Sequence, residues 1–260
     1  MSEQTIDVFP GAQSVSRAIA LLKAFEDTQP EWSLGDLSGR LGLNKTTTHR
    51  LLAALEAEGL VTQSESTAQY RLGSELIALG GCALRANELR TLSRPVLEAL
   101  AMESGETTTL EILSRRQIMI LDEVSNRHPM GMSQHVGSRL PIHATSTGKL
   151  LLAHQPEEAR DLILAQPLAR LTPKTITDPE RLRAEMDDIR AQGYATADGE
   201  LDVGFVAVAA PIYDAGRRVI AALSAGGPGL RLSTERLPSM VASVLESARS
   251  ISRQLRYRNE

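Results

Sequence analysis

The sequence has little cysteine, few aromatic residues and no long apolar run. Its 260 residues include one cysteine, Cys82, so no internal disulfide can form and a cysteine-rich metal site is excluded. The longest apolar stretches lie near Val203–Pro211 and Val219–Leu223, far short of the roughly 20 residues that a membrane helix needs. The opening residues MSEQTIDVFPG lack the basic and apolar regions of a secretory signal. We therefore expect a soluble cytoplasmic protein with no membrane partner.

Positive charge is also scarce, because the formal net charge is −4 at pH 7. This balance does not indicate nucleic-acid binding, so any basic surface must be local. One window, between Leu37 and Leu55, contains Arg40, Lys45 and Arg50 and neither Asp nor Glu. The hydrophobic fraction of 42% is sufficient for packed cores. The window therefore indicates a confined cationic face on an otherwise acidic protein.

The N-terminal part of the chain shows three helical patterns followed by a hairpin pattern. Apolar residues recur with helical spacing from Ser14 onwards. Gly42 then suits the left-handed end of a second helix, and Asn44 suits the N-cap of a third. Two short strand-like runs, 60–63 and 69–72, flank a polar turn. This order is typical of a winged helix-turn-helix. The assigned ranges are 1–12 for a flexible leader and 13–73 for the winged helix-turn-helix.

The third helical pattern gives the strongest indication of DNA binding. At about 100° of rotation per residue, Thr46, Arg50 and Ala53 fall opposite the leucine face, where small and polar side chains suit a DNA major groove. The alternative is an ordinary solvated helix face, but the helix order, the acid-free window and the wing favour groove recognition. Arg50 is expected to read bases and Lys45 to contact phosphate. The predicted contacts to double-stranded operator DNA are Arg17, Arg40, Lys45, Thr46, Thr47, His49, Arg50 and Arg71.

The rest of the chain mixes helical and strand-like patterns. A long Ala/Leu-rich pattern at 74–92 predicts a linker helix. Helices flanking a mostly antiparallel sheet are typical of an α+β sensor domain, which we assign to residues 93–260 for effector binding and oligomerisation. The predicted strands are 107–113, 118–124, 203–210 and 218–225, and the predicted helices are 95–104, 145–154, 156–166, 178–192 and 233–257.

Several separate motifs resemble those of one family. The chain contains, in order, SVSRAIALLKAF, SLGDLSGRLGLNKTTTHRLLAALEAEGLV, YRLG, RLPIHATSTGKLLLA, LTPKTITD, QGYATADGEL, GFVAVAAPIYD and ALSAGGPGLRLS. From about Ser14 to Leu255 it thus resembles the IclR family of bacterial transcriptional regulators. The resemblance implies a GAF/profilin-like C-terminal domain, a small-molecule effector that alters operator binding, and a homodimer or homotetramer. Dimerisation is also expected because one winged helix covers only half an operator.

The resemblance further implies where the effector binds. Three positions depart from the family pattern, since Ala207 stands where many relatives have Cys, Gly226 where many have Ser, and Gly199 where an acidic pair usually begins. The effector of a relative is therefore unsafe to transfer. The implied effector-binding residues are Met132, Leu140, Ser146, Thr147, Asp198, Phe205, Ala207, Ser224 and Gly226.

The residues around Ser146 give a physical reason for such a site. Ser146 and Thr147 open a helical pattern, so hydroxyls and free backbone N–H groups converge at the positive end of a helix dipole. A small carboxylate suits this environment, and the aromatic content of 3% favours a small polar acid over a large aromatic effector. The alternative, that Thr145 or Ser146 only caps its own helix, stays open.

No pattern indicates catalysis. The segment STGKL lacks the first glycine and the final hydroxyl residue of a P-loop, and no GxSxG motif occurs. The histidines, among them His135 and His143, show no compact metal-ligand spacing. Cys82 has apolar neighbours and is expected to be a packed thiol. We therefore predict a regulator with no catalytic residue, cofactor or metal. The alternative is an enzyme that turns over the effector and carries an accessory winged helix.

Overall fold

The computed structural model describes residues 12–125 and 135–257. The chain divides between Ala86 and Asn87 into two compact units, which are described separately. No helix in the described ranges is long and apolar enough to cross a membrane.

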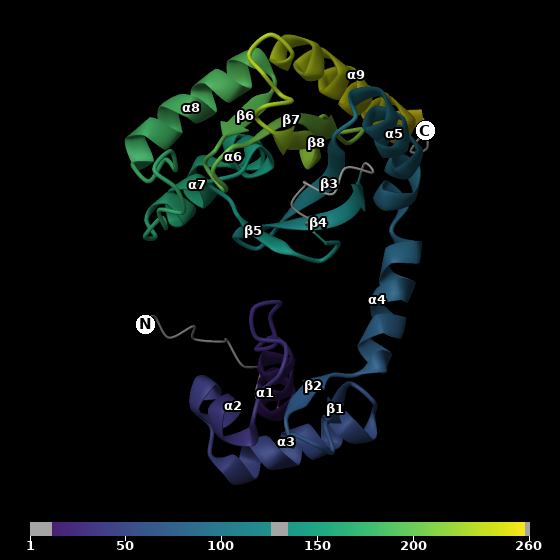
Figure 1. Ribbon diagram of the computed structural model, residues 1–260, viewed down its shortest axis with the longest axis vertical. Coiled ribbons are helices and arrows are strands. Elements are labelled where there is room, and N and C mark those ends of the chain that lie inside the picture. Colours follow the sequence, from purple (N-terminus) through teal and green to yellow (C-terminus); the bar gives the residue numbers. More distant parts are fainter. Residues whose placement is uncertain (1–11, 126–134, 258–260) are drawn as a thin grey trace. The chain divides into compact units, whose positions relative to one another are not determined.

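The first unit is a winged helix-turn-helix, as predicted (Figure 1). The Ser33 hydroxyl accepts the backbone N–H of Asp36 at 3.1 Å at the start of the second helix. Gly42 ends that helix with a left-handed φ of 63°. The elements are α1 (Gln13–Leu22), α2 (Leu34–Leu41), α3 (Lys45–Ala57), β1 (Val61–Gln63), β2 (Tyr70–Leu72) and α4 (Ser74–Ala86).

One small hydrophobic core holds the three helices and the wing together. Leu21 from α1, Leu37 from α2 and Leu52 from α3 are each fully buried in it. The wing joins this core through Tyr70, which also pairs with Trp32 in a β-bridge that the sequence did not predict. The core fixes which face of α3 points outwards.

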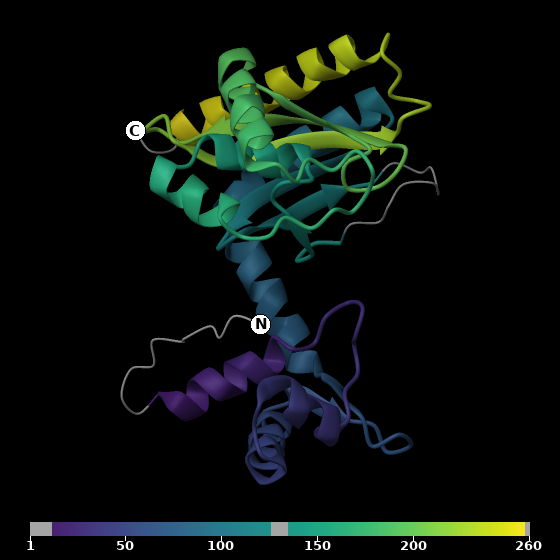
Figure 2. The same cartoon turned by 90° about the vertical axis from the view of Figure 1, so that its left-hand side faces the viewer.

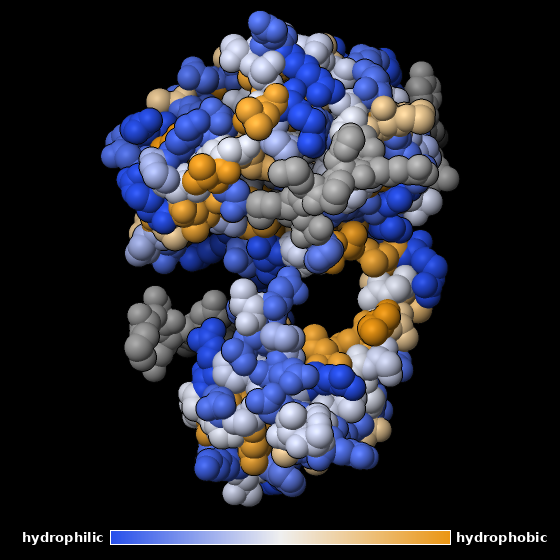
Figure 3. Space-filling view, in the orientation of Figure 1, coloured by the Kyte–Doolittle hydropathy of each residue, from blue (hydrophilic) through white to orange (hydrophobic). Residues whose placement is uncertain are grey.

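The predicted linker helix is shorter than expected. It ends at Ala86, because the side chain of Asn87 accepts the backbone N–H of Arg90 at 3.0 Å and caps a new helix. That helix runs from Glu88 to Ser104 and contains Pro95, which the prediction placed at its start. Hydrophobic side chains gather along α4 (Figure 3), where Ile77 is 79% exposed.

The second unit is built on a six-stranded sheet in the order β5-β4-β3-β8-β7-β6, with every neighbouring pair antiparallel. The predicted α+β class is confirmed, while β5 and β6 were not predicted and the last helix begins later than expected. The elements are α5 (Glu88–Ser104), β3 (Thr107–Ser114), β4 (Gln117–Val124), β5 (Arg139–Pro141), α6 (Ser146–Ala153), α7 (Glu157–Leu164), α8 (Pro179–Gln192), β6 (Ala195–Asp198), β7 (Phe205–Tyr213), β8 (Val219–Pro228) and α9 (Leu237–Tyr257).

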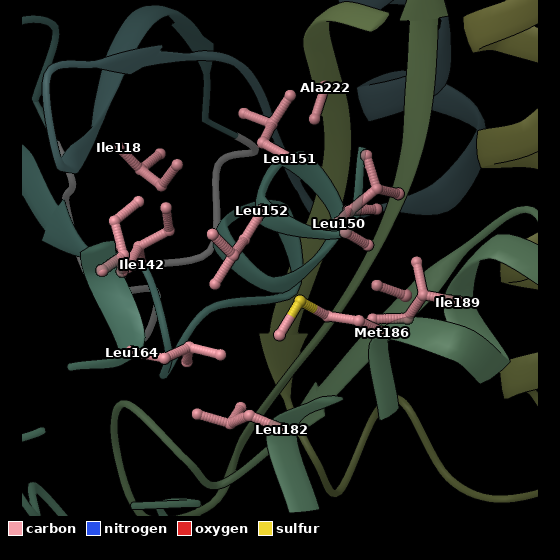
Figure 4. Close-up of a cluster of buried hydrophobic side chains, with 14 residues drawn as sticks. Ile118, Ile142, Leu150, Leu151, Leu152, Leu164, Leu182, Met186, Ile189 and Ala222 are labelled. Carbon is pink, nitrogen blue, oxygen red and sulfur yellow. The ribbon is translucent and has the colours of Figure 1, made fainter. Parts of the chain in front are cut away.

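Different helices pack on the two faces of the sheet. Helices α5 and α9 pack on each other and on one face (Figure 1 and Figure 2). Helix α6 packs on the other face, with α8 behind it. Figure 4 shows the leucines of α6 between Ala222 of the sheet and Met186 of α8. This burial anchors the helix whose first residues form part of the site described below.

Strand β3 contacts helices on both faces of the sheet, because alternate side chains of a strand point to opposite faces. The hydroxyl of Thr108 donates to the carbonyl of Leu97 on α5 at 3.0 Å. Its neighbours Thr109 and Glu111 face α6, where Glu111 accepts a hydrogen bond from Thr147. Side chains on the α6 face of β3 therefore lie inside the domain yet within reach of a small ligand.

Candidate DNA interface and ligand chamber

The N-terminal turn of α3 is capped and solvent-exposed. The side-chain oxygen of Asn44 accepts the backbone N–H of Thr47 at 2.7 Å, as the predicted N-cap requires. Thr48 and Leu52 face the core and are fully buried. The predicted outward face is therefore present, starting at the positive end of the helix dipole, where phosphate oxygens are favoured.

The predicted DNA contacts lie mostly on open surface. Only Thr47 on α3 and Arg17 on α1 are half-buried. Among the described residues, none of the predicted lysine and arginine contacts forms an ion pair, so their charges are available to an external anion. The exposed members are Arg40 on α2, Lys45, Thr46, His49 and Arg50 on α3, and Arg71 on β2.

The second unit contains a chamber between the sheet and the start of α6. Its empty space, open mouth included, is about 530 Å3. One part of its wall is apolar, and the other carries hydroxyl and carboxyl groups. The lining residues are Thr107, Thr109, Glu111, Leu140, Ala144, Thr145, Ser146, Thr147, Ala197, Glu200, Leu201, Phe205, Ala207, Ser224 and Gly226.

Most of the predicted effector-binding residues are brought together in this chamber. The exceptions are Met132, which lies outside the described residues, and Asp198, which does not line it. Asp198 lies outside the chamber: in β6 the side chain of Ala197 lines it, so the next side chain points away. The Asp198 carboxylate is exposed and pairs with Lys174 at 2.8 Å. The predicted residues that line the chamber are Leu140, Ser146, Thr147, Phe205, Ala207, Ser224 and Gly226.

The N-terminus of α6 lies in the chamber wall and favours the binding of an anion. Thr145 caps the helix, because its hydroxyl accepts the backbone N–H of Gly148 at 3.0 Å. The backbone N–H groups of Ser146 and Thr147 have no hydrogen-bond partner among the described residues. A side chain at Gly148 would overlap the carbonyl oxygen of Ile142. Close packing thus requires glycine at this position.

Glu111 is a chamber residue that was not predicted from the sequence. It is 3% exposed, and its two oxygens accept hydrogen bonds of 2.5 Å from the hydroxyls of Thr109 and Thr147. Thr109 also lies 3.3 Å from the hydroxyl of Ser224. Burial raises the pKa of Glu111, and the two threonine hydrogen bonds oppose this shift. Only the alternation of TTTLEILS in a strand, with its odd positions facing the chamber, could have indicated this residue.

A second missed group is the buried ion cluster of Lys149, Glu185 and Glu200. The Lys149 ammonium is 1% exposed, binds Glu200 at 2.6 Å and also contacts Glu185 of α8. Burial raises the pKa of Glu200, while Lys149 lowers it. The other oxygen of Glu200 has no hydrogen-bond partner among the described residues. Glu200 is the member of the cluster that lines the chamber, and the Lys149–Glu185 pair ties α6 to α8.

The aromatic wall of the chamber depends on a glycine. Phe205 packs over Gly226, where an added Cβ would lie 2.9 Å from the phenyl ring and 3.1 Å from the Cβ of Ala207. A larger residue at position 226 would therefore displace the ring. The departures from the family pattern noted at positions 207 and 226 lie side by side, since these residues are cross-strand partners.

The structure also shows the surroundings of Cys82 and His143, two residues considered from the sequence as a packed thiol and a metal ligand. Cys82 is exposed on α4 and not packed, and its sulfur accepts a hydrogen bond from Arg85 at 3.3 Å. His143 is buried with Nε2 2.8 Å from the carbonyl oxygen of Ala169. The described residues contain no group of three His, Cys, Asp or Glu side chains able to hold a metal ion.

A winged helix-turn-helix whose exposed cations form no ion pair among the described residues is joined in one chain to a domain with a ligand-sized chamber. This combination defines a ligand-responsive DNA-binding protein. The IclR helix-turn-helix domain matches residues 14–65, and the bacterial transcriptional regulator IclR C-terminal domain matches residues 82–253. The chain therefore belongs to the IclR family and is a DNA-binding transcriptional regulator.

Individual relatives and solved structures agree with this assignment. The chain is 34% identical to the glycerol operon regulatory protein of Streptomyces coelicolor, over 94% of this chain and 96% of that protein. A putative IclR transcriptional regulator from Silicibacter sp. TM1040 superposes with a TM-score of 0.84 at 30% identity, over 94% of this chain and 96% of that one. An IclR homologue from Microbacterium hydrocarbonoxydans, solved with 4-hydroxybenzoate, gives a TM-score of 0.81 at 31% identity, over 94% and 100%.

Proposed function

We propose that this regulator changes its affinity for an operator when a small carboxylic acid occupies the chamber at the start of α6. The chamber carries the proposal, because it joins helix N–H groups that have no partner among the described residues, and several hydroxyls, to an apolar wall. The similar Microbacterium protein binds 4-hydroxybenzoate, which has a carboxylate and an apolar ring.

On the DNA side, residues 13–73 form the operator-binding domain, and Arg50 reads bases from the exposed face of α3. One such domain covers half a site, so the functional unit is a homodimer or homotetramer on a pseudo-palindromic operator. The protein acts in the cytoplasm, where its DNA is. Its effector is bound and released unchanged, in keeping with relatives that are transcriptional regulators.

The test separates effector response from DNA binding. We expect Thr147→Val and Ser224→Ala to weaken stabilisation by the effector in a thermal-shift screen of small carboxylic acids, 4-hydroxybenzoate included, by removing hydroxyls from the chamber wall. Operator affinity without effector should stay within about twofold of wild type, because neither residue lies in the DNA-binding unit.

The control is Asp198→Asn, which removes a charge from the same domain but not from the chamber. Its response to the acids should equal that of wild type. Loss of ligand-free operator binding in the chamber variants would assign those residues to folding, and turnover of an acid that Thr147→Val abolishes would assign the chamber to catalysis.

A further inference from the structure

Glu111 differs from the other buried acidic side chains in the described ranges. Glu106 is paired with Arg231 and Arg236, Asp122 with two arginines of α5, and Glu200 with Lys149. Glu111 is as deeply buried as these groups, yet its hydrogen-bond partners are the two threonine hydroxyls alone. A buried carboxylate without a cation is costly unless it takes up a proton.

The charged groups on the surrounding elements do not supply a free cation. On the far face of the sheet, Arg90 and Arg94 of α5 are bound to Asp122 of β4, and the neighbouring Glu98 of α5 is itself acidic. On the chamber side, Lys149 of α6 is held by two glutamates. Among the residues described, β8 brings no charged side chain to this region, and Glu123 of β4 adds negative charge.

We propose that Glu111 stays a neutral carboxylic acid in the empty chamber and donates its proton in a hydrogen bond to the carboxylate of the effector. This inference rests on the proposed function, because it names the charge state with which that same site receives an acid. A protonated carboxyl group has one O–H donor, and its bond to a carboxylate is charge-assisted and short. The two threonines hold the carboxyl group in place and leave its proton free to turn towards the ligand.

The proposal fixes the direction of the pH dependence. Below the pKa of Glu111 the chamber offers a neutral donor, so acid binding is at its strongest. Above that pKa an ionised Glu111 repels the incoming carboxylate, and affinity falls by up to about tenfold per pH unit. A cationic ligand would show the opposite trend, because it would pair with the ionised carboxylate.

The first experiment needs no effector. Since burial raises the pKa of Glu111 in the folded state, the unfolded chain releases this proton at lower pH than the native protein. Native stability is therefore full below the ordinary glutamate pKa and declines as pH rises towards the raised value. Glu111→Gln lacks this decline, so its stability relative to wild type should increase steadily above about pH 4.5. Parallel curves for the two proteins would overturn the neutral state of Glu111.

The second experiment measures binding of 4-hydroxybenzoate and a series of smaller monocarboxylates by calorimetry from pH 5 to pH 9. We expect wild-type affinity for the acids that bind to fall with rising pH, and Glu111→Gln to keep a constant affinity because its amide remains a neutral donor. Asp198→Asn should titrate like wild type.

The outcomes separate this inference from the proposed function. Acid binding that is independent of pH and of Glu111→Gln overturns the donor role and leaves the effector site standing. Affinity that rises with pH also overturns the donor role. If no acid binds while the stability curves diverge as expected, the neutral Glu111 stands, and both the acid effector and the donor role fall.

Discussion

Helices α3 and α6 begin with similar residues, but the start of α3 is exposed to solvent and α6 is buried inside its domain. Each follows a side-chain N-cap, Asn44 or Thr145, and the first four residues of each include hydroxyl side chains and a lysine. In α3 the first two residues are exposed, whereas all eight residues of α6 are buried. The same local pattern therefore forms an outward surface in one unit and an inner wall in the other.

The two lysines show what this difference does to charge. Lys45 is exposed and free of ion pairs within the described residues, so its charge is available to phosphate. Lys149 is 1% exposed and neutralised by Glu185 and Glu200. Burial converts a cation from a binding group into a structural one, because a buried charge must be paired within the protein.

The lysine comparison gives the largest expected effect. Lys149→Met leaves two carboxylates without their cation and should lower the free energy of unfolding of the C-terminal domain by about 3–5 kcal/mol. Lys45→Met should change stability by less than about 0.5 kcal/mol. Urea unfolding followed by circular dichroism measures both. Trp32, the one tryptophan of the chain, reports on the N-terminal unit separately.

A matched double variant, Lys149→Met with Glu200→Gln, should recover part of the lost stability, because one unpaired carboxylate is removed together with the cation. A single Lys149→Met variant as stable as wild type would contradict the structural role of the buried cluster.

The exposed face of α3 gives the next effect. Arg50→Ala should weaken specific operator binding by about 1–3 kcal/mol and relax base preference, because arginine contacts guanine with two hydrogen bonds. Lys45→Ala should weaken binding to specific and non-specific DNA alike, since a phosphate contact carries no sequence information. Titrations at several fixed salt concentrations measure both. Unchanged affinity and base preference in Arg50→Ala would remove it from base reading.

Much of the outward-facing site was predictable from the sequence, because its determinants are local. The capping residue Asn44, the left-handed Gly42 and the leucine face of α3 are each set by a few neighbouring residues, and all were predicted. The apolar side of α3 packs into the core together with the wing, so its polar side is left exposed.

The chamber was less predictable, because its partners are distant in sequence. Glu111 and Thr147 are 36 residues apart, and Lys149 and Glu200 are 51 apart. Periodicity within one segment does not indicate such a pair. The family resemblance implied Asp198, and not Glu111 or Glu200, as the acidic residue of the chamber. The short strands β5 and β6 were missed for a similar reason, since three or four residues carry too little alternation to stand out.

The two N-caps give the smallest effect and the most direct test of the comparison. Asn44→Ala should lower stability by about 1 kcal/mol, because water can reach the uncapped N–H group of half-buried Thr47. Thr145→Ala should cost about 2 kcal/mol, because it leaves the N–H of buried Gly148 without a hydrogen-bond partner among the described residues. Thermal and urea unfolding of both variants give the two values, with Asn44→Ser and Thr145→Ser as controls that keep a capping oxygen. Equal losses at the two caps would mean that burial does not distinguish these helix starts, and the contrast between an outward surface and an inner wall would then lose its energetic basis.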